Sequence, residues 1–294
     1  MNHLHNLEIE LKNRFKVIND YKLLKVIQWY ENTIYCLLKW GRIFYLKEIK
    51  SLSCFTIETY VLSNLNEWDY LIPKIEESFI SKQANIITEV RWKILEVITH
   101  QDAQNLWMSL KNLHTECKKI KNFPDIQDNN FLVLYNLFRN NILNEINSRK
   151  FFNEEQISIL LKTLEILEKF IAKYYDSLDK IIIHWDLNSW NILFWNKVWF
   201  IDFEKSRFWH VWEDLVRLNS RVFKSNPILL KSFFQWYWID KDEKNDLINF
   251  MNYFELFDSI ADISYFLYKW YNNWYYFHIN AFQRISKILQ TQKL

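Results

Sequence analysis

Three oxygen-bearing side chains lie within seventeen residues in the second half of the chain. Asp186 follows the apolar run Lys180–His184, Asn191 comes five residues later, and Asp202 stands in Ile201-Asp202-Phe203-Glu204. Phosphoryl transfer uses this set, because a carboxylate must orient the attacking hydroxyl and hard oxygen ligands must hold Mg²⁺ on the nucleotide phosphates. We therefore predict Asp186 as the catalytic residue, Asn191 and Asp202 as metal ligands, and ATP and Mg²⁺ as cofactors.

The segments around these residues are expected to hold them rigidly. Short apolar strands are predicted at Lys180–His184, Ile192–Phe194 and Lys197–Ile201, the last two forming a hairpin. Transfer depends mostly on positioning and charge neutralisation, which short strand ends serve well. A chance H-x-D-x-x-x-x-N on a surface loop would not be followed by a hairpin and a second motif at this spacing.

A second set of charged residues lies near the N-terminus. Lys47 ends a predicted strand and Glu58 lies early in the following predicted helix. A strand lysine paired with a helix glutamate holds nucleotide phosphates in kinases, so we assign both residues to nucleotide binding. Glu48 and Glu67 remain alternatives to Glu58, and Lys47 taken alone could be a solvated charge at a strand edge.

Two further segments are candidates for nucleotide contacts by position. The turn Gln28–Thr33 contains Asn32 and would cover the phosphates, or it is an ordinary hairpin turn. Residues 88–91 would form a hinge whose backbone, at Glu89 and Val90, pairs with the adenine edge.

The patterning predicts an α+β fold with two lobes. Strands are expected at Tyr21–Gln28, Thr33–Lys39 and Arg42–Ile49, a helix at Phe55–Leu65, and strands at Ile72–Phe79 and Asn85–Arg91. This gives a small antiparallel β lobe with one helix over residues 1–90. Residues 91–294 are expected to form a larger, mostly helical lobe, with amphipathic helices at Gln101–Glu116 and Glu154–Tyr175 and more helices from about residue 211.

Glycine is almost absent and tryptophan is unusually common. The chain has one Gly and 15 Trp, whereas average usage of about 7% predicts about twenty glycines. With Gly in place of Trp, residues 184–195 read HGDLNSGNILFG, and Trp40-Gly41 becomes Gly-Gly, a strong hairpin turn. We infer that UGA codons for glycine have been translated as tryptophan. An indole at Trp185 or Trp190 is expected to crowd the catalytic loop.

These residues resemble the aminoglycoside phosphotransferase and choline kinase family, whose members share a protein-kinase-like fold. The resemblance runs from QWYENTIYCLLKWGRIFYLKE to IIIHWDLNSWNILFWNKVWFIDFEKSRFWHVWEDLVRL, nearly the whole chain. It implies the same roles for Asp186, Asn191, Asp202, Lys47 and Glu58. It also implies a structural His114 in Leu-His, an Asp214 that caps a helix or braces a loop, and a His184 that braces the catalytic loop. The tryptophans depart from the family pattern.

Composition and charge bound the compartment and partners. The net charge of +2 gives no argument for nucleic acid or an anionic membrane, and no apolar run suggests a signal peptide or a membrane span. Cys36, Cys54 and Cys117 form no metal or disulfide pattern, so a cytoplasmic location is expected. The sequence leaves the oligomeric state open.

The leading interpretation is a small-molecule kinase that moves the γ-phosphoryl group of ATP to a substrate hydroxyl, as an aminoglycoside phosphotransferase does. A choline, ethanolamine or sugar kinase of the same fold is the first alternative, and a non-catalytic ATP-binding protein is another. IDFEKSRF passes quickly into WHVWEDL, which argues against a regulated protein kinase. Acidic residues between Asp240 and Asp262 could bind a polycation or simply face solvent. An aromatic-rich stretch over 265–277 could hold a quaternary ammonium or pack the core.

The coding inference predicts the mass of the native protein. If UGA is read as glycine at the motif positions, the intact mass will be lower than the printed sequence requires. Mass spectrometry of the protein from its natural source measures this directly. A mass that matches fifteen tryptophans would contradict the inference.

Overall fold

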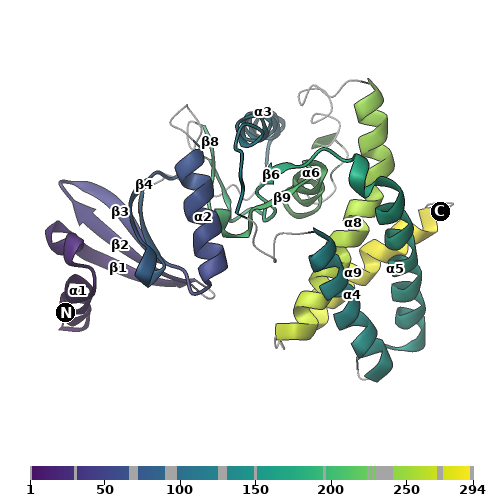
Figure 1. The fold of residues 1–294 in the computed structure, drawn as a ribbon, viewed down its shortest axis with the longest axis horizontal. Coiled ribbons are helices and arrows are strands. Elements are labelled where there is room, and N and C mark those ends of the chain that lie inside the picture. Colours follow the sequence, from purple (N-terminus) through teal and green to yellow (C-terminus); the bar gives the residue numbers. More distant parts are fainter. Residues whose placement is uncertain are drawn as a thin grey trace. The chain divides into compact units, whose positions relative to one another are not determined.

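The structure is a computed structural model of the whole chain. It describes residues 2–29, 32–65, 72–89, 98–124, 131–148, 151–194, 197–223, 226, 228–229, 241–269 and 274–291, and all structural statements below concern these residues. Two compact units are present (Figure 1). Unit 1 comprises Met1–Val97, Thr115–Pro124 and Ser189–Ser206, and unit 2 comprises Ile98–His114, Asp125–Asn188 and Arg207–Leu294. The sequence-based division at residue 90 stays a prediction.

Unit 1 is built on a five-stranded antiparallel sheet, in agreement with the predicted α+β class. The strand order is β1-β2-β3-β5-β4, and every neighbouring pair is antiparallel. The bounds are β1 Lys22–Trp29, β2 Asn32–Lys39, β3 Arg42–Glu48, β4 Ile75–Phe79 and β5 Ala84–Thr88. All five strands were predicted, because their β-branched and aromatic residues are bounded by polar turns.

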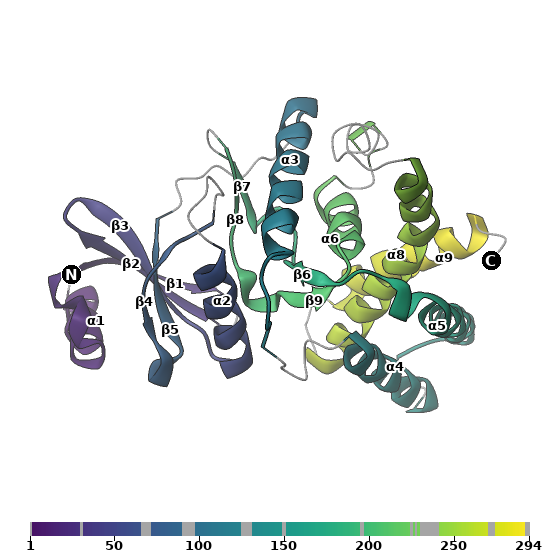
Figure 2. The same ribbon diagram turned by 45° about the horizontal axis from the view of Figure 1, so that its top comes forward.

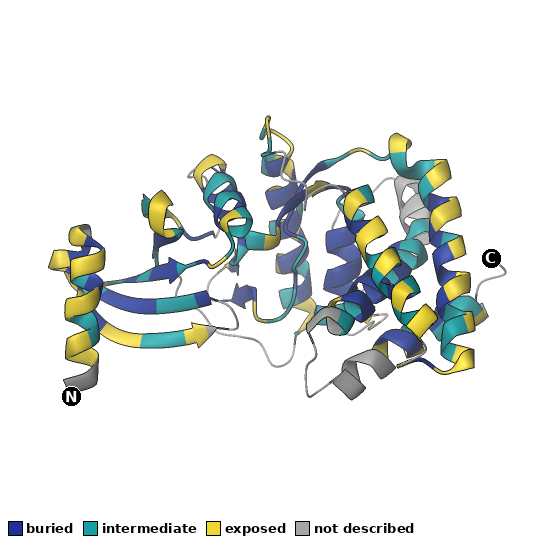
Figure 3. Ribbon diagram, turned by 60° about the horizontal axis from the view of Figure 1, so that its bottom comes forward, coloured by how far each residue is buried: buried dark blue, intermediate teal, exposed yellow. Residues whose placement is uncertain are grey.

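One helix covers each face of this sheet (Figure 1). Side chains alternate between faces along a strand, so Phe44 and Leu46 of β3 point one way and Lys47 the other. Phe44 and Leu46 pack in one cluster with Leu11 of the helix α1, Asn2–Arg14, and with Phe15, the residue directly after that helix. The opposite face carries α2, Leu52–Asn64, whose start is capped by the Ser51 hydroxyl. Figure 3 shows the burial that results, with the central strands buried and α1 exposed on its outer side.

The helix α1 was not predicted from the sequence. Its segment reads as polar and mixed in charge, and its apolar content is low. The helix is nevertheless fixed to the sheet, because Leu11 and Phe15 are almost fully buried. Tertiary packing of a few apolar residues therefore outweighs a weak local pattern.

Residues 189–206 add a short hairpin to unit 1. Strand β7, Ile192–Phe194, pairs antiparallel with β8, Val198–Phe200. Both strands were predicted, the second one residue longer at each end. A short 3₁₀ turn, Phe203–Lys205, follows and packs on α2.

Unit 2 is mostly helical (Figure 2). Its longer helices are α3 His100–Cys117, α4 Phe131–Ser148, α5 Glu154–Tyr174, α8 Lys241–Lys269 and α9 Trp274–Thr291. The predicted Glu154–Tyr175 helix is confirmed as α5. Asn153 caps it, because its side chain accepts from the Gln156 backbone while the Gln156 side chain accepts from the Asn153 backbone. Leu160, Leu164 and Leu167 bury its apolar face, as their spacing predicts.

Unit 2 also contains a two-stranded sheet and a short helix that continues into a π-helical turn. Strand β6, Ile181–Ile183, pairs antiparallel with β9, Arg207–Trp209, which was not predicted. The helix α6, Trp212–Arg217, continues directly into a π-helical turn, Leu218–Val222. A three-residue strand such as β9 carries too little periodicity to be recognised from sequence.

Other composition-based expectations have outcomes in the described residues. All three cysteines are free thiols. None of the helices in the ranges given above has both the length and the apolar character that a membrane span requires. Most of the aromatic stretch 265–277 lies outside the residues whose side chains the structure describes; Tyr265 is exposed.

The turn between β2 and β3 has the backbone that glycine favours. Gly41 has φ of 73°, and Trp40 before it has φ of 51°, so both residues are left-handed, as in a type I′ hairpin turn. A bulky residue with positive φ is an outlier. The indole of Trp40 is 83% exposed and contacts Lys39 through its ring face. The backbone geometry of this turn therefore agrees with glycine at position 40.

We expect Trp40→Gly to stabilise the protein. Relief of the left-handed strain should raise the free energy of unfolding by about 1 kcal/mol, reduced by the lost contact with Lys39. Trp190→Gly is the matched control, because Trp190 is also exposed (58%) but its backbone is not left-handed. There the added chain flexibility should lower the stability by about 0.5–1 kcal/mol. Urea denaturation measures both, and equal changes in the two variants would contradict the assignment.

Candidate active site

A buried lysine at the end of β3 contacts three carboxylates, all within unit 1. Lys47 Nζ lies 2.9 Å from Glu58 Oε1, 2.6 Å from Asp202 Oδ1 and 3.4 Å from Glu204 Oε2. These carboxylates come from α2 and from the segment that follows β8. The fold thus brings together Lys47, Glu58 and Asp202, which the sequence singled out independently. Of the two alternatives to Glu58, Glu48 contacts Tyr35 and Arg14 instead, and Glu67 lies outside the described residues.

The cluster has more negative than positive charge. Burial alone would lower the pKa of Lys47, but the carboxylates of Asp202, Glu58 and Glu204 outweigh burial and raise the pKa well above its usual value. Burial also raises the pKa of Glu58 to about 7, against the attraction of Lys47. The ammonium group is therefore a permanent charge, and the surplus of carboxylates favours an additional cation nearby.

Asn32 belongs to this cluster. Its side-chain amide donates to Glu204 Oε2 at 2.7 Å, and the Gln28 side chain donates to its backbone carbonyl. Asn32 begins β2 and is buried, whereas Tyr30 and Glu31 of the predicted phosphate turn lie outside the described residues. Sequence reasoning missed Glu204, although it lies in the same I-D-F-E motif as Asp202.

The hairpin β7–β8 places Asn191 and Asp202 at one end. Ile192 pairs with Phe200, and the backbone N–H of Ile201 donates to the Asn191 carbonyl at 3.1 Å. Asn191 is thus opposite Ile201, directly before Asp202. Asp202 itself has φ of 68°, a left-handed conformation that Asp adopts more easily than most residues.

Asp186 lies in unit 2, in the loop that follows β6. Its side chain is half-buried, and the Asn188 amide donates to its backbone carbonyl and to Oδ1. Its backbone N–H donates to Nδ1 of His184 at 3.3 Å. His184 is therefore held as a structural brace of the loop, as the resemblance implies.

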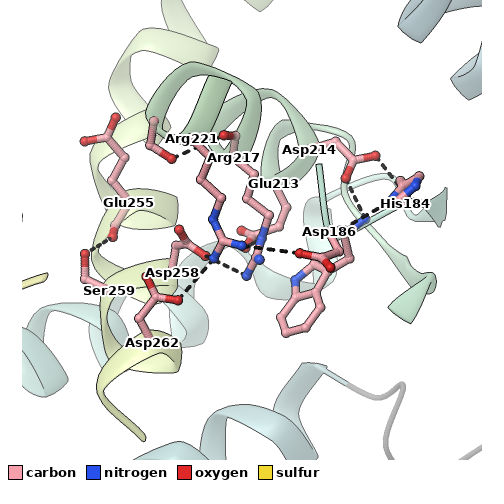
Figure 4. A network of polar contacts seen from close by, with 12 residues as sticks. His184, Asp186, Glu213, Asp214, Arg217, Arg221, Glu255, Asp258, Ser259 and Asp262 are labelled. Atoms are coloured by element: carbon pink, nitrogen blue, oxygen red, sulfur yellow. Dashed lines mark hydrogen bonds and ion pairs between the residues drawn. The ribbon is translucent and has the colours of Figure 1, made fainter. Parts of the chain in front are cut away.

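Asp214 of α6 ties down the same loop (Figure 4). The backbone N–H of His184 donates to Oδ2 at 2.9 Å and that of Trp185 donates to Oδ1 at 2.7 Å. His114 Nε2 lies 3.0 Å from Oδ2. Asp214 is fully buried in the first turn of α6, so it stands at a helix start as well as bracing the loop, although Val211 is the N-cap residue. Burial would raise its pKa, but the bond from His114 and the positive field of His114 and His184 lower it.

The two tryptophans of the catalytic loop have different surroundings. Trp185 has φ of 62°, and its ring contacts the guanidinium groups of Arg207 and Arg217, whose central carbons lie 3.0 and 4.0 Å from the ring centroid. Among the described residues, its buried indole N–H finds no hydrogen-bond partner. Trp190 is 58% exposed, so the expectation that it crowds the loop is wrong. The left-handed backbone at Trp185 is a second position where the geometry agrees with glycine.

The predicted hinge is only partly described. The backbone N–H of Glu89 donates to the Ile43 carbonyl at 3.2 Å, so this donor is already used within the sheet. Val90 lies outside the described residues. A role for either residue in adenine binding stays a prediction.

The sequence matches the model of the phosphotransferase enzyme family over residues 82–243, more than half of the chain. The chain belongs to this family. It is accordingly an ATP-dependent phosphotransferase of the small-molecule kinase type. The matched segment contains Asp186, Asn191, Asp202 and Asp214.

Solved structures of such enzymes share the fold. A GDP complex of an aminoglycoside 2′-phosphotransferase IIIa mutant is 15% identical, with 98% of each chain covered and a TM-score of 0.70. The choline kinase LicA from Streptococcus pneumoniae is also 15% identical, with 98% of this chain and 100% of that chain covered and a TM-score of 0.69. Spectinomycin phosphotransferase with ADP and spectinomycin is 14% identical, with 94% and 93% covered and a TM-score of 0.64.

Among curated proteins no sequence match was found. The identities of 14–15% to the solved structures establish the shared fold and leave the substrate undetermined.

We expect Asp214→Asn to damage both stability and turnover. Only one oxygen would remain to accept from the loop backbone and His114, which leaves a buried donor unsatisfied at a cost of about 1–3 kcal/mol. The rate should fall further than the loss of folded protein explains, because the loop carries Asp186. Urea denaturation and phosphorylation assays measure the two effects. Asp176→Asn, at an exposed carboxylate of unit 2, is the control, and equal behaviour of both variants would contradict the bracing role.

Proposed function

We propose that the protein transfers the γ-phosphoryl group of ATP to a hydroxyl of a small molecule, with Asp186 as the catalytic residue. Lys47, held by Glu58, binds nucleotide phosphate, and Asn191 and Asp202 are the Mg²⁺ ligands. Asn32, which donates to Glu204 in the Lys47 cluster, is a proposed nucleotide contact. Glu89 and Val90 are proposed nucleotide contacts from their place in the predicted hinge sequence alone. Asp186 orients the hydroxyl and accepts its proton as the bond to phosphorus forms.

One observation supports this proposal above the others. Lys47 is 2.9 Å from Glu58 and 2.6 Å from Asp202 at the same time. Kinases require this lysine–glutamate pair and a metal-binding aspartate to be in place together. A fold that had lost catalysis would have no need to keep two buried charges, Lys47 and Glu58, and a partly buried Asp202, whose desolvation is costly.

The residues present fit a magnesium ion. Asn191 and Asp202 supply hard oxygen donors from one end of a hairpin, and the Lys47 cluster carries surplus negative charge. In the described part of the chain, no group of three or more His, Cys, Asp and Glu is arranged to hold a metal. That agrees with Mg²⁺, which takes one or two protein carboxylates and completes its shell with phosphate and water. Bound there, the ion would neutralise charge on the transferred phosphoryl group.

A regulated protein kinase fits less well. Between Asp202 and the start of α6 at Trp212 the chain forms only a 3₁₀ turn and the three-residue strand β9. This leaves no room for a long phosphorylated activation segment. The acceptor is therefore proposed to be a small molecule.

Aminoglycosides are the first substrate class to test, followed by choline, ethanolamine and sugars. Solved structures with this fold include a spectinomycin phosphotransferase, a choline kinase, an ethanolamine kinase and an aminoglycoside phosphotransferase in complex with hygromycin B. The acidic residues of α8 do little to identify the substrate. Asp258 is buried, against the expectation that these residues face solvent. Asp258 and Asp262 are both paired with arginines. Asp240 lies outside the described residues, and the side chains of Asp242 and Glu243 are not described.

We expect Asp186→Ala to lower the rate of transfer by about 10²–10⁴-fold and to leave nucleotide affinity within a few-fold of the unchanged protein. Removal of the carboxylate takes away proton acceptance, worth about 10²–10⁴-fold, but no phosphate contact. Phosphorylation of the substrate panel and equilibrium ATP–Mg²⁺ binding measure the two properties. Asp176→Ala is the control variant. Binding of ATP without transfer to any substrate by the unchanged protein would favour the non-catalytic alternative.

A further inference from the structure

One arginine of unit 2 links the proposed catalytic residue to two carboxylates of α8. Arg221 Nη1 lies 3.4 Å from Asp186 Oδ1, and its Nη2 lies 3.0 Å from Asp258 Oδ1 and 3.1 Å from Asp262 Oδ1 (Figure 4). The two nitrogens of a single planar guanidinium group thus face different partners. No sequence pattern pointed to Arg221, which lies 35 residues from Asp186.

The backbone conformation at Arg221 is unusual. Arg221 lies in the π-helical turn Leu218–Val222, directly after α6. A π-helical turn holds one residue more than an α-helical turn and occurs frequently at functional sites. Arg217, before the turn, contacts Glu213 and Asp258, whereas Arg221, within it, also reaches Asp186. The turn therefore carries a second residue, besides Asp214 of α6, that reaches the loop of Asp186.

The guanidinium group of Arg221 is largely buried and is surrounded by carboxylates. Its side chain is 23% exposed, and those of Asp186 and Asp262 are 30% and 24% exposed, while Asp258 is buried. Burial alone would lower the pKa of Arg221, but Asp258, Asp262 and Asp186 raise it. A guanidinium group held by two carboxylates of a long helix has little freedom to move, so it offers Asp186 a fixed cation.

We propose that Arg221 is a positioning residue that fixes the orientation of the Asp186 carboxylate for phosphoryl transfer. This rests on the proposed function. Oδ1 of Asp186 receives the Arg221 guanidinium at 3.4 Å and the Asn188 amide at 3.3 Å. Two donors on one oxygen restrict rotation of the carboxylate plane. A catalytic group that is held in the productive orientation loses less in reaching the transition state.

Arg284 of α9 is the matched comparison. It contacts the same two carboxylates of α8, at 2.7 Å from Asp262 Oδ2 and 3.9 Å from Asp258 Oδ2. Arg284→Gln therefore removes the same charge from the same pair of aspartates. A purely structural role of Arg221 predicts that Arg221→Gln and Arg284→Gln behave alike.

The test combines steady-state kinetics with a double-variant cycle. Arg221→Gln should lower kcat about 10- to 100-fold with the KM for ATP unchanged, and Arg284→Gln should lower kcat less than threefold. Arg221→Lys keeps a charge without the fork and should be intermediate; it also serves if Arg221→Gln fails to fold. In Asp186→Asn, the further Arg221→Gln change should have no additional effect on kcat.

Several outcomes would overturn the proposal. One is an unchanged kcat in Arg221→Gln, another is an equal loss in Arg284→Gln, and a third is a full additional loss in the Asp186→Asn background. Inactivity of the unchanged protein with every substrate would instead refute the proposed function. In that case thermal unfolding of the single and double variants still tests the Asp186–Arg221 contact, which additive shifts in Tm would refute.

Discussion

The buried ammonium group of Lys47 is the constraint on which unit 1 depends. It comes from the centre of a sheet, and its partners come from a helix and from a segment more than 150 residues away in the chain. A buried charge is tolerated only when paired, so sheet, helix and distal segment must assemble together. The same ion pairs set the electrostatics of the proposed phosphate site. The contacts that assemble unit 1 are therefore the same contacts that form the proposed phosphate site.

In unit 2 the proposed catalytic residue is held in place by a different kind of contact. Here a single buried carboxylate, that of Asp214, accepts from two backbone N–H groups of the loop that carries Asp186. The loop forms no helix or strand over residues 184–188, and the aspartate ties its backbone to α6.

The sequence predicted the elements with strong periodicity and the residues with recognisable spacing. All five strands of the sheet, the hairpin β7–β8 and the helix α5 were recognisable, as were Lys47, Glu58, Asn191 and Asp202. The helix α1, strand β9, Glu204 and Arg221 were missed. Each depends on contacts between distant residues that leave no local periodicity, and Arg221 depends on a π-helical turn that no residue pattern announces. The unusual number of tryptophans was evident from composition. The structure adds support for glycine at Trp40 and Trp185, where the backbone is left-handed.

The π-helical turn after α6 also constrains how this chain can change in length. A regular helix turns by about 100° per residue, so removing one residue from Leu218–Val222 would restore regular winding and rotate everything after it. The Arg221 side chain would then no longer point toward Asp186, while Arg217, which lies before the turn, would keep its partners. Single-residue deletions should thus be far less tolerated in this five-residue stretch than in the loops of the same unit. A sequence whose helix winds regularly through this stretch would match this arginine only if a gap were placed there.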